Sequence, residues 1–320
     1  MSRDKLSRRH FLGHSAAAVG ALGLIGQEST AAENNTPMQV KIGINLLLYT
    51  VDLPVEKLDL IARMAELGYD GVEIPLAVPD TMDTSAIRRA LEKAGIEATT
   101  SASNPPTGNI ISPDAAVRRA GDEHYKRIIG LAAEIGAHVI TGPMYSPISY
   151  ITGRWRTEEE WKRSVEHLRK AAETAAAYDI ILTIEPLNRF ETFLINTAAD
   201  AVAFIKAVDH PNLRIQLDTF HMNIEELNTG AAIRKAGKYL GHFHASENNR
   251  GIPGTGQVPW KEVFAALREI GWQRWVTIES FASGIRELAA AASVWRPLYP
   301  SADELARQGL AFIRKMAGRA

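Results

Sequence analysis

Four consecutive apolar segments in the second half of this 320-residue chain each end in a side chain that can bind a metal or move a proton. These terminal residues are Glu185, Asp218, His244 and Glu279. One carboxylate after an apolar segment commonly caps the next helix. If the four segments are neighbouring strands, however, three carboxylates converge, and they would repel one another strongly in a poorly hydrated site without a cation. The pattern therefore predicts a divalent metal bound by these four residues.

The donor set indicates which metal to expect. Three carboxylates and one imidazole are mainly hard ligands, which favour Mn²⁺ or Mg²⁺ and tolerate Co²⁺, whereas a sulfur-rich or all-histidine set would indicate zinc. The chain has no cysteine, which excludes disulfides, thiolate ligands and a cysteine nucleophile. We expect Mn²⁺, with Mg²⁺ or Co²⁺ as alternatives.

The elements that would position these residues alternate between short apolar segments and longer segments with helical periodicity. The expected strands are 41–48, 71–74, 97–101, 138–141, 180–185, 213–217, 239–244 and 275–279, and clear helical segments between them are 54–67, 114–135, 157–178, 197–208 and 260–270. Eight strands at a spacing of about 35 residues fit an α/β fold of the (β/α)8 TIM-barrel type, whose chemistry lies at the carboxyl ends of the strands. Glycines that follow helical segments, at Gly68, Gly95, Gly136 and Gly271, fit helix C-caps.

The first 31 residues differ from the rest. Four cations, including the pair Arg8 and Arg9, precede a short apolar stretch from Phe11 to Gly26, and small residues at Ser29 and Ala31 fit a cleavage site. This arrangement resembles a twin-arginine export signal, and the apolar stretch is too short for a comfortable membrane span. We expect residues 1–31 to be a signal peptide and residues 32–320 to be one TIM-barrel catalytic domain in the periplasm. The alternatives for the first segment are an amphipathic helix and an anchor that is not cleaved.

The charge balance excludes one class of partner. The chain carries 36 Lys and Arg against 37 Asp and Glu, and the segment after residue 31 keeps 32 cations against 35 acidic groups. Nucleic-acid binding normally needs a basic excess, so we expect none. A metal-dependent endonuclease on this fold would also need more histidines and a basic groove.

Longer motifs around the four strand ends carry a family resemblance. They are IEPLNRFET at 184–192, QLDTFHMNIEE at 216–226, GHFHASENNR at 241–250 with PGTG at 253–256, IESF at 278–281, and SPDAAVRRAG at 112–121. These segments resemble the D-tagatose/D-psicose (allulose) 3-epimerase family, within the xylose isomerase-like sugar isomerases and epimerases. The resemblance extends over nearly the whole chain after residue 31.

The resemblance implies roles for specific residues. Glu185, Asp218, His244 and Glu279 would be the metal ligands, and Glu185 and Glu279 would also be the acid/base pair. Glu191, His221 and Arg250 would bind the O1 to O3 end of the sugar. The partner would be a small sugar, with no nucleic acid and no stable membrane insertion after processing, and the oligomeric state stays open.

The implied reaction explains why these residue types are needed. Inverting C3 of a ketose requires removal of the proton beside the C2 carbonyl, which a metal on the C2 and C3 oxygens would acidify by stabilising a cis-enediolate. A second carboxylate can return a proton to the opposite face. We predict a metal-dependent 3-epimerase of D-tagatose, D-fructose, D-psicose or L-ribulose type. Alternatives are a hydroxypyruvate or aldose–ketose isomerase, an epimerase of a 3-keto-glycoside, or a non-catalytic sugar-binding protein.

Other polar residues permit two interpretations. His242 is expected to pack behind His244, and Glu247 is expected to brace a loop rather than bind metal. Glu73 either orients groups in the pocket or lies at the barrel rim. Tyr49 either stacks on the substrate or is a rim aromatic. The segment 141–150 departs from the family pattern, which would place a Trp near Ile148, so the resemblance predicts the reaction better than the sugar.

Overall fold

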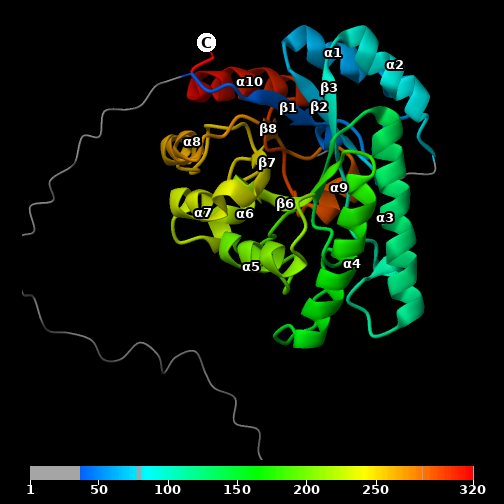
Figure 1. Ribbon diagram of the computed structural model, residues 1–320. Helices are drawn as coiled ribbons and strands as arrows, with labels where there is room; N and C mark the ends of the chain where they lie inside the picture. The colour runs from blue at the N-terminus through cyan, green and yellow to red at the C-terminus, as the bar shows by residue number, and fades with distance from the viewer. Residues whose placement is uncertain (1–36, 78–80, 283, 320) are drawn as a thin grey trace, which may run out of the picture. The chain divides into compact units, whose positions relative to one another are not determined.

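Eight parallel strands close into a barrel, as the sequence predicts. The computed structural model describes residues 37–77, 81–282 and 284–319; the expected signal peptide lies outside them. The strands pair in chain order and β8 pairs with β1, so the sheet has no free edge (Figure 1). Their bounds are β1 Lys41–Asn45, β2 Gly71–Pro75, β3 Glu97–Ser101, β4 Val139–Gly142, β5 Ile181–Ile184, β6 Leu213–Asp218, β7 Leu240–Ala245 and β8 Trp275–Ile278.

Helices follow the strands and pack on the outside of the sheet. The described helices are α1 Asp59–Leu67, α2 Thr84–Ala94, α3 Ala115–Ile135, α4 Glu158–Ala176, α5 Ala198–Val208, α6 Thr219–Glu225, α7 Thr229–Ala236, α8 Trp260–Glu269, α9 Arg286–Ala291 and α10 Ala302–Ala317. Local sequence sets several of their ends. Thr157 and Glu160 form a capping box at the start of α4, and Gly136 ends α3 with a φ of 89°, a left-handed conformation that favours glycine. None of the described helices is long and apolar enough to cross a membrane.

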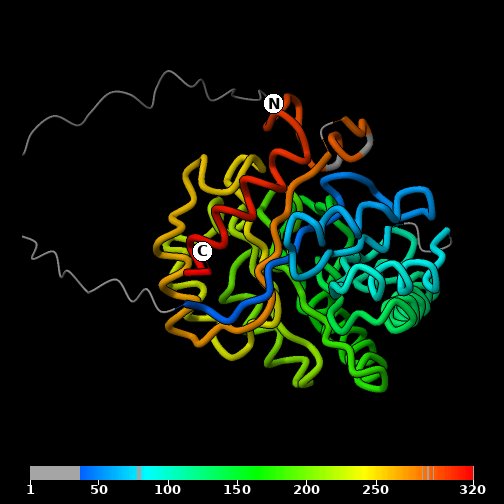
Figure 2. Tube along the Cα trace, turned by 90° about the horizontal axis from the view of Figure 1, so that it is seen from above, coloured from blue at the N-terminus to red at the C-terminus, as the bar shows by residue number. Residues whose placement is uncertain are grey.

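The last helix covers the first strand. The amide of Met38 donates to the carbonyl of Ala317 at 2.8 Å, and Arg319 forms an ion pair with Asp70 at 2.7 Å. Figure 2 shows the first described residues in blue running beside the red α10. This contact ties the two ends of the barrel domain together across the β8–β1 closure.

Side-chain direction separates an apolar layer from a polar interior. In β2, Val72 and Ile74 join the hydrophobic core, whereas Glu73 between them contacts polar groups of other strands. Because successive strand residues point to opposite faces, the core fills the space between strands and helices, and the inward face carries the functional groups.

The first strand is shorter than the sequence predicts. It ends at Asn45 rather than continuing to Leu48, because the Asn45 side chain accepts a hydrogen bond from the Leu47 amide and caps a 3₁₀ turn over Leu46–Leu48. The turn brings Leu47 to the pocket described below.

Candidate active site and metal centre

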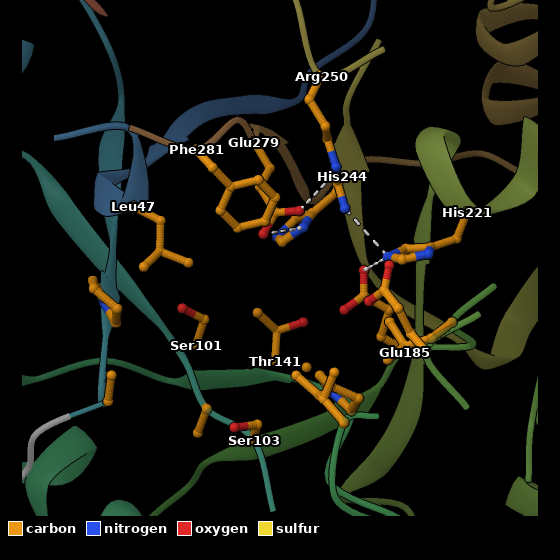
Figure 3. A pocket seen from close by; sticks show the side chains of 18 residues that line it. Leu47, Ser101, Ser103, Thr141, Glu185, His221, His244, Arg250, Glu279 and Phe281 are labelled. Carbon is orange, nitrogen blue, oxygen red and sulfur yellow. Dashed lines mark hydrogen bonds and ion pairs between the residues drawn. The ribbon is translucent and has the colours of Figure 1, made fainter. Parts of the chain in front are cut away.

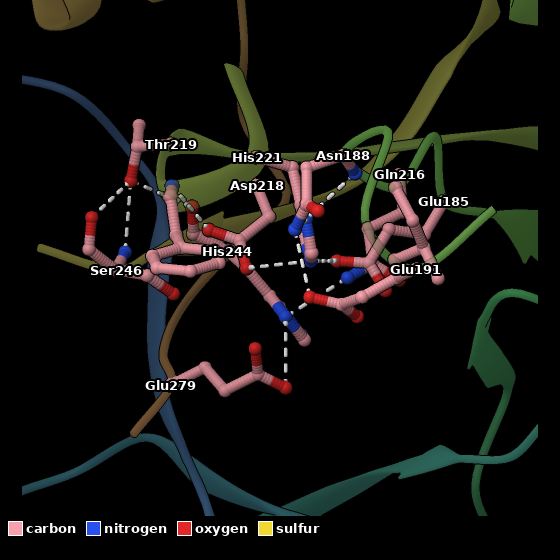
Figure 4. Close-up of polar contacts among 12 residues, drawn as sticks. Glu185, Asn188, Glu191, Gln216, Asp218, Thr219, His221, His244, Ser246 and Glu279 are labelled. Atoms are coloured by element: carbon pink, nitrogen blue, oxygen red, sulfur yellow. Dashed lines mark hydrogen bonds and ion pairs between the residues drawn. The ribbon is translucent and has the colours of Figure 1, made fainter. Parts of the chain in front are cut away.

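The structure brings the four strand-end residues together. Each of Glu185, Asp218, His244 and Glu279 offers one ligand atom, and these atoms all lie within 4.8 Å of one another. All four residues are buried. Asp218 and His244 lie opposite each other in the β6–β7 pairing, and Glu185 and Glu279 directly follow β5 and β8. Figure 4 shows the side chains converging from these strands. The cluster is a candidate site for a divalent cation.

The electrostatics of the cluster fit a bound cation. Burial and the neighbouring Glu279 carboxylate raise the pKa of Glu185 well above its usual value. Oxygen Oε1 of Glu185 is buried and has no hydrogen-bond partner among the described residues. Asp218 differs: burial opposes its ionisation, but the charges of Arg250 and His221 lower its pKa to about 2. An unpartnered carboxylate oxygen beside two more carboxylates is the environment that a metal ion stabilises.

Arg250 is the fixed cation of the site. Its Nη1 donates to Asp218 Oδ2 and Glu279 Oε2, both at 2.7 Å, and to the Ser246 hydroxyl at 3.0 Å. Its guanidinium also lies over the rings of Phe220, at 3.9 Å from the centroid, and Phe281, at 4.8 Å. Figure 3 shows Arg250 reaching the pocket from the loop after β7. These contacts hold a positive charge between two of the candidate ligands.

His221 and Glu191 face the same pocket and are linked through Asn188. The Asn188 amide and side chain approach His221 Nδ1 at 3.1 and 3.0 Å, and the side chain donates to Glu191 Oε1 at 2.7 Å. Burial lowers the pKa of His221 to about 3, so its imidazole is neutral at pH 7. Nε2 of His221 also lies 3.3 Å from Arg250 Nη2. The three expected sugar-binding residues therefore form one polar group, and Asn188, which the sequence indicates as a brace of the loop after the fifth strand, links two of them.

The opposite wall of the pocket is small and largely uncharged. It is contributed by β1 to β4 and their loops and contains Leu47, Pro75, Ala77, Ser101, Ala102, Ser103, Thr141, Gly142, Pro143 and Ile148. In Figure 3, Leu47, Ser101 and Ser103 lie across the hollow from Glu185 and His221. The pocket thus has a reactive side and a neutral side.

Glu73 belongs to a second buried cluster behind His244. Its Oε1 lies 2.9 Å from His244 Nε2, and its Oε2 lies 2.9 Å from His242 Nε2. Burial alone would raise the pKa of Glu73, but the two histidines hold it well below its usual value. Glu73 is fully buried, so the rim interpretation is wrong. The sequence signal that could have indicated this role was the position of Glu73, a carboxylate in the middle of the apolar segment 71–75.

Two other residues behave as structural groups. Glu247 accepts hydrogen bonds from the Gly254 amide at 2.8 Å and Trp260 Nε1 at 3.0 Å, so it braces its own loop as expected. The Tyr49 hydroxyl lies 3.1 Å from Asp303 Oδ1, and Tyr49 does not line the described pocket. This position favours the rim interpretation of Tyr49.

The sequence is similar to that of known proteins over most of its length. The xylose isomerase-like TIM barrel family profile matches residues 61–316. The D-psicose 3-epimerase of Ruminiclostridium cellulolyticum is 39% identical over 249 residues, which cover 76% of this chain and 85% of the relative. The L-ribulose 3-epimerase of Mesorhizobium japonicum is 34% identical over 276 residues, covering 85% and 93%.

A solved structure extends this similarity to three dimensions. The D-allulose 3-epimerase of Methylomonas sp., crystallised with D-allulose, superposes with a TM-score of 0.83 at 31% identity and covers 88% of this chain and 98% of its own. High coverage at this identity, together with the eight-stranded barrel and its buried carboxylate–histidine cluster, establishes the relationship. The chain belongs to the ketose 3-epimerase family of xylose isomerase-like TIM barrels and is an isomerase.

Proposed function

We propose that this protein inverts C3 of a free ketose with Glu185 and Glu279 as the two proton-transfer groups. The observation that carries the proposal is their placement: they follow different strands and point into one hollow beside the fixed cation Arg250 (Figure 3). A non-catalytic sugar-binding protein would not need two carboxylates from different strands in the pocket.

The two carboxylates divide the proton transfer. One, as the carboxylate, takes the C3 proton, and the other, as the carboxylic acid, gives a proton to the opposite face of C3. Their protonation states are then exchanged and are reset through solvent. Arg250 supplies a fixed positive charge that stabilises the negative charge developing on a substrate oxygen. The neutral imidazole of His221 and the side chain of Glu191 hold hydroxyl groups of the sugar.

A divalent metal fits this arrangement. Glu185, Asp218, His244 and Glu279 would hold the ion, which when bound supplies the positive charge that makes the proton beside the carbonyl more acidic. Their mainly hard donor set favours Mn²⁺, with Mg²⁺ or Co²⁺ as alternatives. The proposal of Mn²⁺ rests on ligand type.

The neutral wall supports an unphosphorylated sugar. Its residues are small, apolar or hydroxyl-bearing, and the cation in the pocket lining, Arg250, is already paired with Asp218 and Glu279. A sugar phosphate would need a free cationic group at its distal end. D-psicose, D-fructose, D-tagatose and L-ribulose are therefore the substrates that we propose, in agreement with the names of the relatives.

The test follows isotope from solvent. The purified protein, loaded with Mn²⁺ in deuterated water, should convert a ketose to its C3 epimer with deuterium at C3, and a chelator should abolish turnover. Mass spectrometry and NMR locate the label. Label at C1 or C2 would identify aldose–ketose isomerisation instead, and label beside the keto group of a 3-keto-glycoside would identify that alternative. Full activity in chelator would exclude the metal-dependent mechanism.

We also propose that residues 1–31 direct export to the periplasm through the twin-arginine pathway. Support comes from the Arg8–Arg9 pair before a modest apolar stretch. Replacing both arginines by lysine should leave the precursor in the cytoplasm, as measured by cell fractionation. Unchanged periplasmic accumulation would exclude this signal.

A further inference from the structure

We propose that Glu73 is a positioning residue that sets which nitrogen of His244 faces the metal site. Glu73 does not touch the pocket, and it lies 171 residues from His244 in the chain, on β2 rather than β7. The inference deepens the proposed function and rests on it, because it concerns a ligand of the proposed metal.

Hydrogen bonds on both sides of the His244 ring define its tautomer. The Thr141 hydroxyl donates to Gln216 Oε1, which leaves the Gln216 Nε2 amide group facing His244 Nδ1 at 2.8 Å. An amide NH₂ donates, so Nδ1 is the acceptor nitrogen and carries no proton. The proton is then on Nε2, which donates to Glu73 Oε1 at 2.9 Å.

This tautomer suits metal binding from the pocket side. Nδ1 is 3.4 Å from Glu279 Oε1, so Nδ1 is the ring nitrogen beside another candidate ligand, and a bound metal would take its lone pair in place of the Gln216 amide. A carboxylate that accepts from the opposite ring nitrogen fixes the orientation of a metal-binding histidine and makes it a stronger donor. Glu73 has the geometry for both effects.

The surroundings of Glu73 keep it as an acceptor in one position. Asn45 Nδ2 donates to its Oε1 at 2.8 Å, and the Thr99 hydroxyl donates to its Oε2 at 3.0 Å. The same Asn45 group also reaches Glu279 Oε1 at 3.2 Å. Glu73 is thus connected to two of the four candidate ligands, directly to His244 and through Asn45 to Glu279.

His242 reinforces this arrangement without reaching the pocket. Its Nε2 lies 2.9 Å from Glu73 Oε2, although neither ring nitrogen has an aligned hydrogen-bond partner among the described residues. Its ring packs edge-on against His244, with centroids 5.1 Å apart. Because the oxygens of Glu73 are occupied by these donors, we assign Glu73, His242 and His244 to a supporting network rather than to a second metal site.

The test separates metal affinity from folding. Glu73→Gln keeps the shape of the side chain but leaves one acceptor oxygen for the three groups that donate to Glu73. Competition with a chromogenic chelator should show Mn²⁺ binding weakened by about 10- to 100-fold. Saturating Mn²⁺ should restore most of the turnover, with little change in KM for the sugar.

Glu247→Gln is the matched control. Glu247 is also fully buried and accepts several hydrogen bonds, but within the described part of the chain no hydrogen bond or ion pair joins its side chain to a candidate ligand. Its variant should melt at a lower temperature and keep wild-type Mn²⁺ affinity. Equal weakening in both variants would show general loosening of the barrel and overturn the inference.

The remaining outcomes distinguish this inference from the proposed function. Wild-type Mn²⁺ affinity in Glu73→Gln would overturn the role of Glu73 and leave the epimerase proposal standing. A wild-type protein that binds metal but leaves C3 unlabelled would overturn the epimerase proposal alone. If Glu73→Gln does not fold, Thr99→Val tests the inference instead, because it removes one hydrogen-bond donor that fixes the Glu73 carboxylate. Unchanged Mn²⁺ affinity in Thr99→Val would then overturn the inference.

Discussion

The two halves of the barrel contribute very different walls to one pocket. Strands β5 to β8 and their loops supply the acidic groups, the histidines and Arg250, whereas β1 to β4 supply Leu47, small residues and the hydroxyls of Ser101 and Ser103. In Figure 3 these sets face each other across the hollow. In the proposed function, the second half would set the reaction and the first half would set which sugar fits.

The two halves of the barrel also differ in how their polar side chains are held in place. In the second half, Arg250 is held by two carboxylates and two aromatic rings, and Asn188 ties His221 to Glu191. In the first half, Glu73 and Asn45 contact the ligand cluster from behind and are absent from the pocket lining. A barrel can thus change its substrate-facing residues while the reactive side keeps its geometry, since function resides in the site rather than in the fold.

Removing a carboxylate from the reactive side should have the largest effect. Glu185→Gln and Glu279→Gln should each lower turnover by at least about 10²–10⁴-fold, the usual contribution of general acid/base catalysis. Steady-state kinetics measure the loss, and elemental analysis must show whether each variant keeps its metal, because both residues are also proposed ligands. A metal-loaded variant with nearly full turnover would contradict the two-carboxylate mechanism.

Changes on the neutral side should be much smaller. Ser101→Ala and Ser103→Ala each remove one pocket hydroxyl, and a neutral hydrogen bond contributes about 0.5–1.5 kcal/mol, or roughly a 2- to 10-fold change in kcat/KM. The change should fall mainly on KM and should differ between ketoses, with deuterium still at C3. A loss of turnover comparable to that of Glu185→Gln would show that the division between the two walls is wrong.

Much of the fold could be predicted from local sequence. The apolar segments predicted all eight strands close to their observed bounds. Gly136 and Thr157 mark helix ends, because the left-handed backbone at Gly136 and the capping box at Thr157 depend on residues nearby in the sequence. The end of β1 was predicted three residues too late, because the cap at Asn45 depends on its side chain turning back to the Leu47 amide. An apolar run alone does not reveal that turn.

Residue type and position by themselves determined the reactive half of the site: Glu185, Asp218, His244 and Glu279 end successive strands, and barrel closure makes successive strand ends neighbours. The sequence predicted that Glu247 braces a loop, but it left Glu73 open between a group that orients the pocket and a residue at the barrel rim. The tertiary structure decided that Glu73 lies against His244, whereas Glu247 binds its own loop. The physical reason is that a buried carboxylate takes its role from the donors that surround it, and for Glu73 those donors come from β1, β3 and β7, which only the closed barrel brings together.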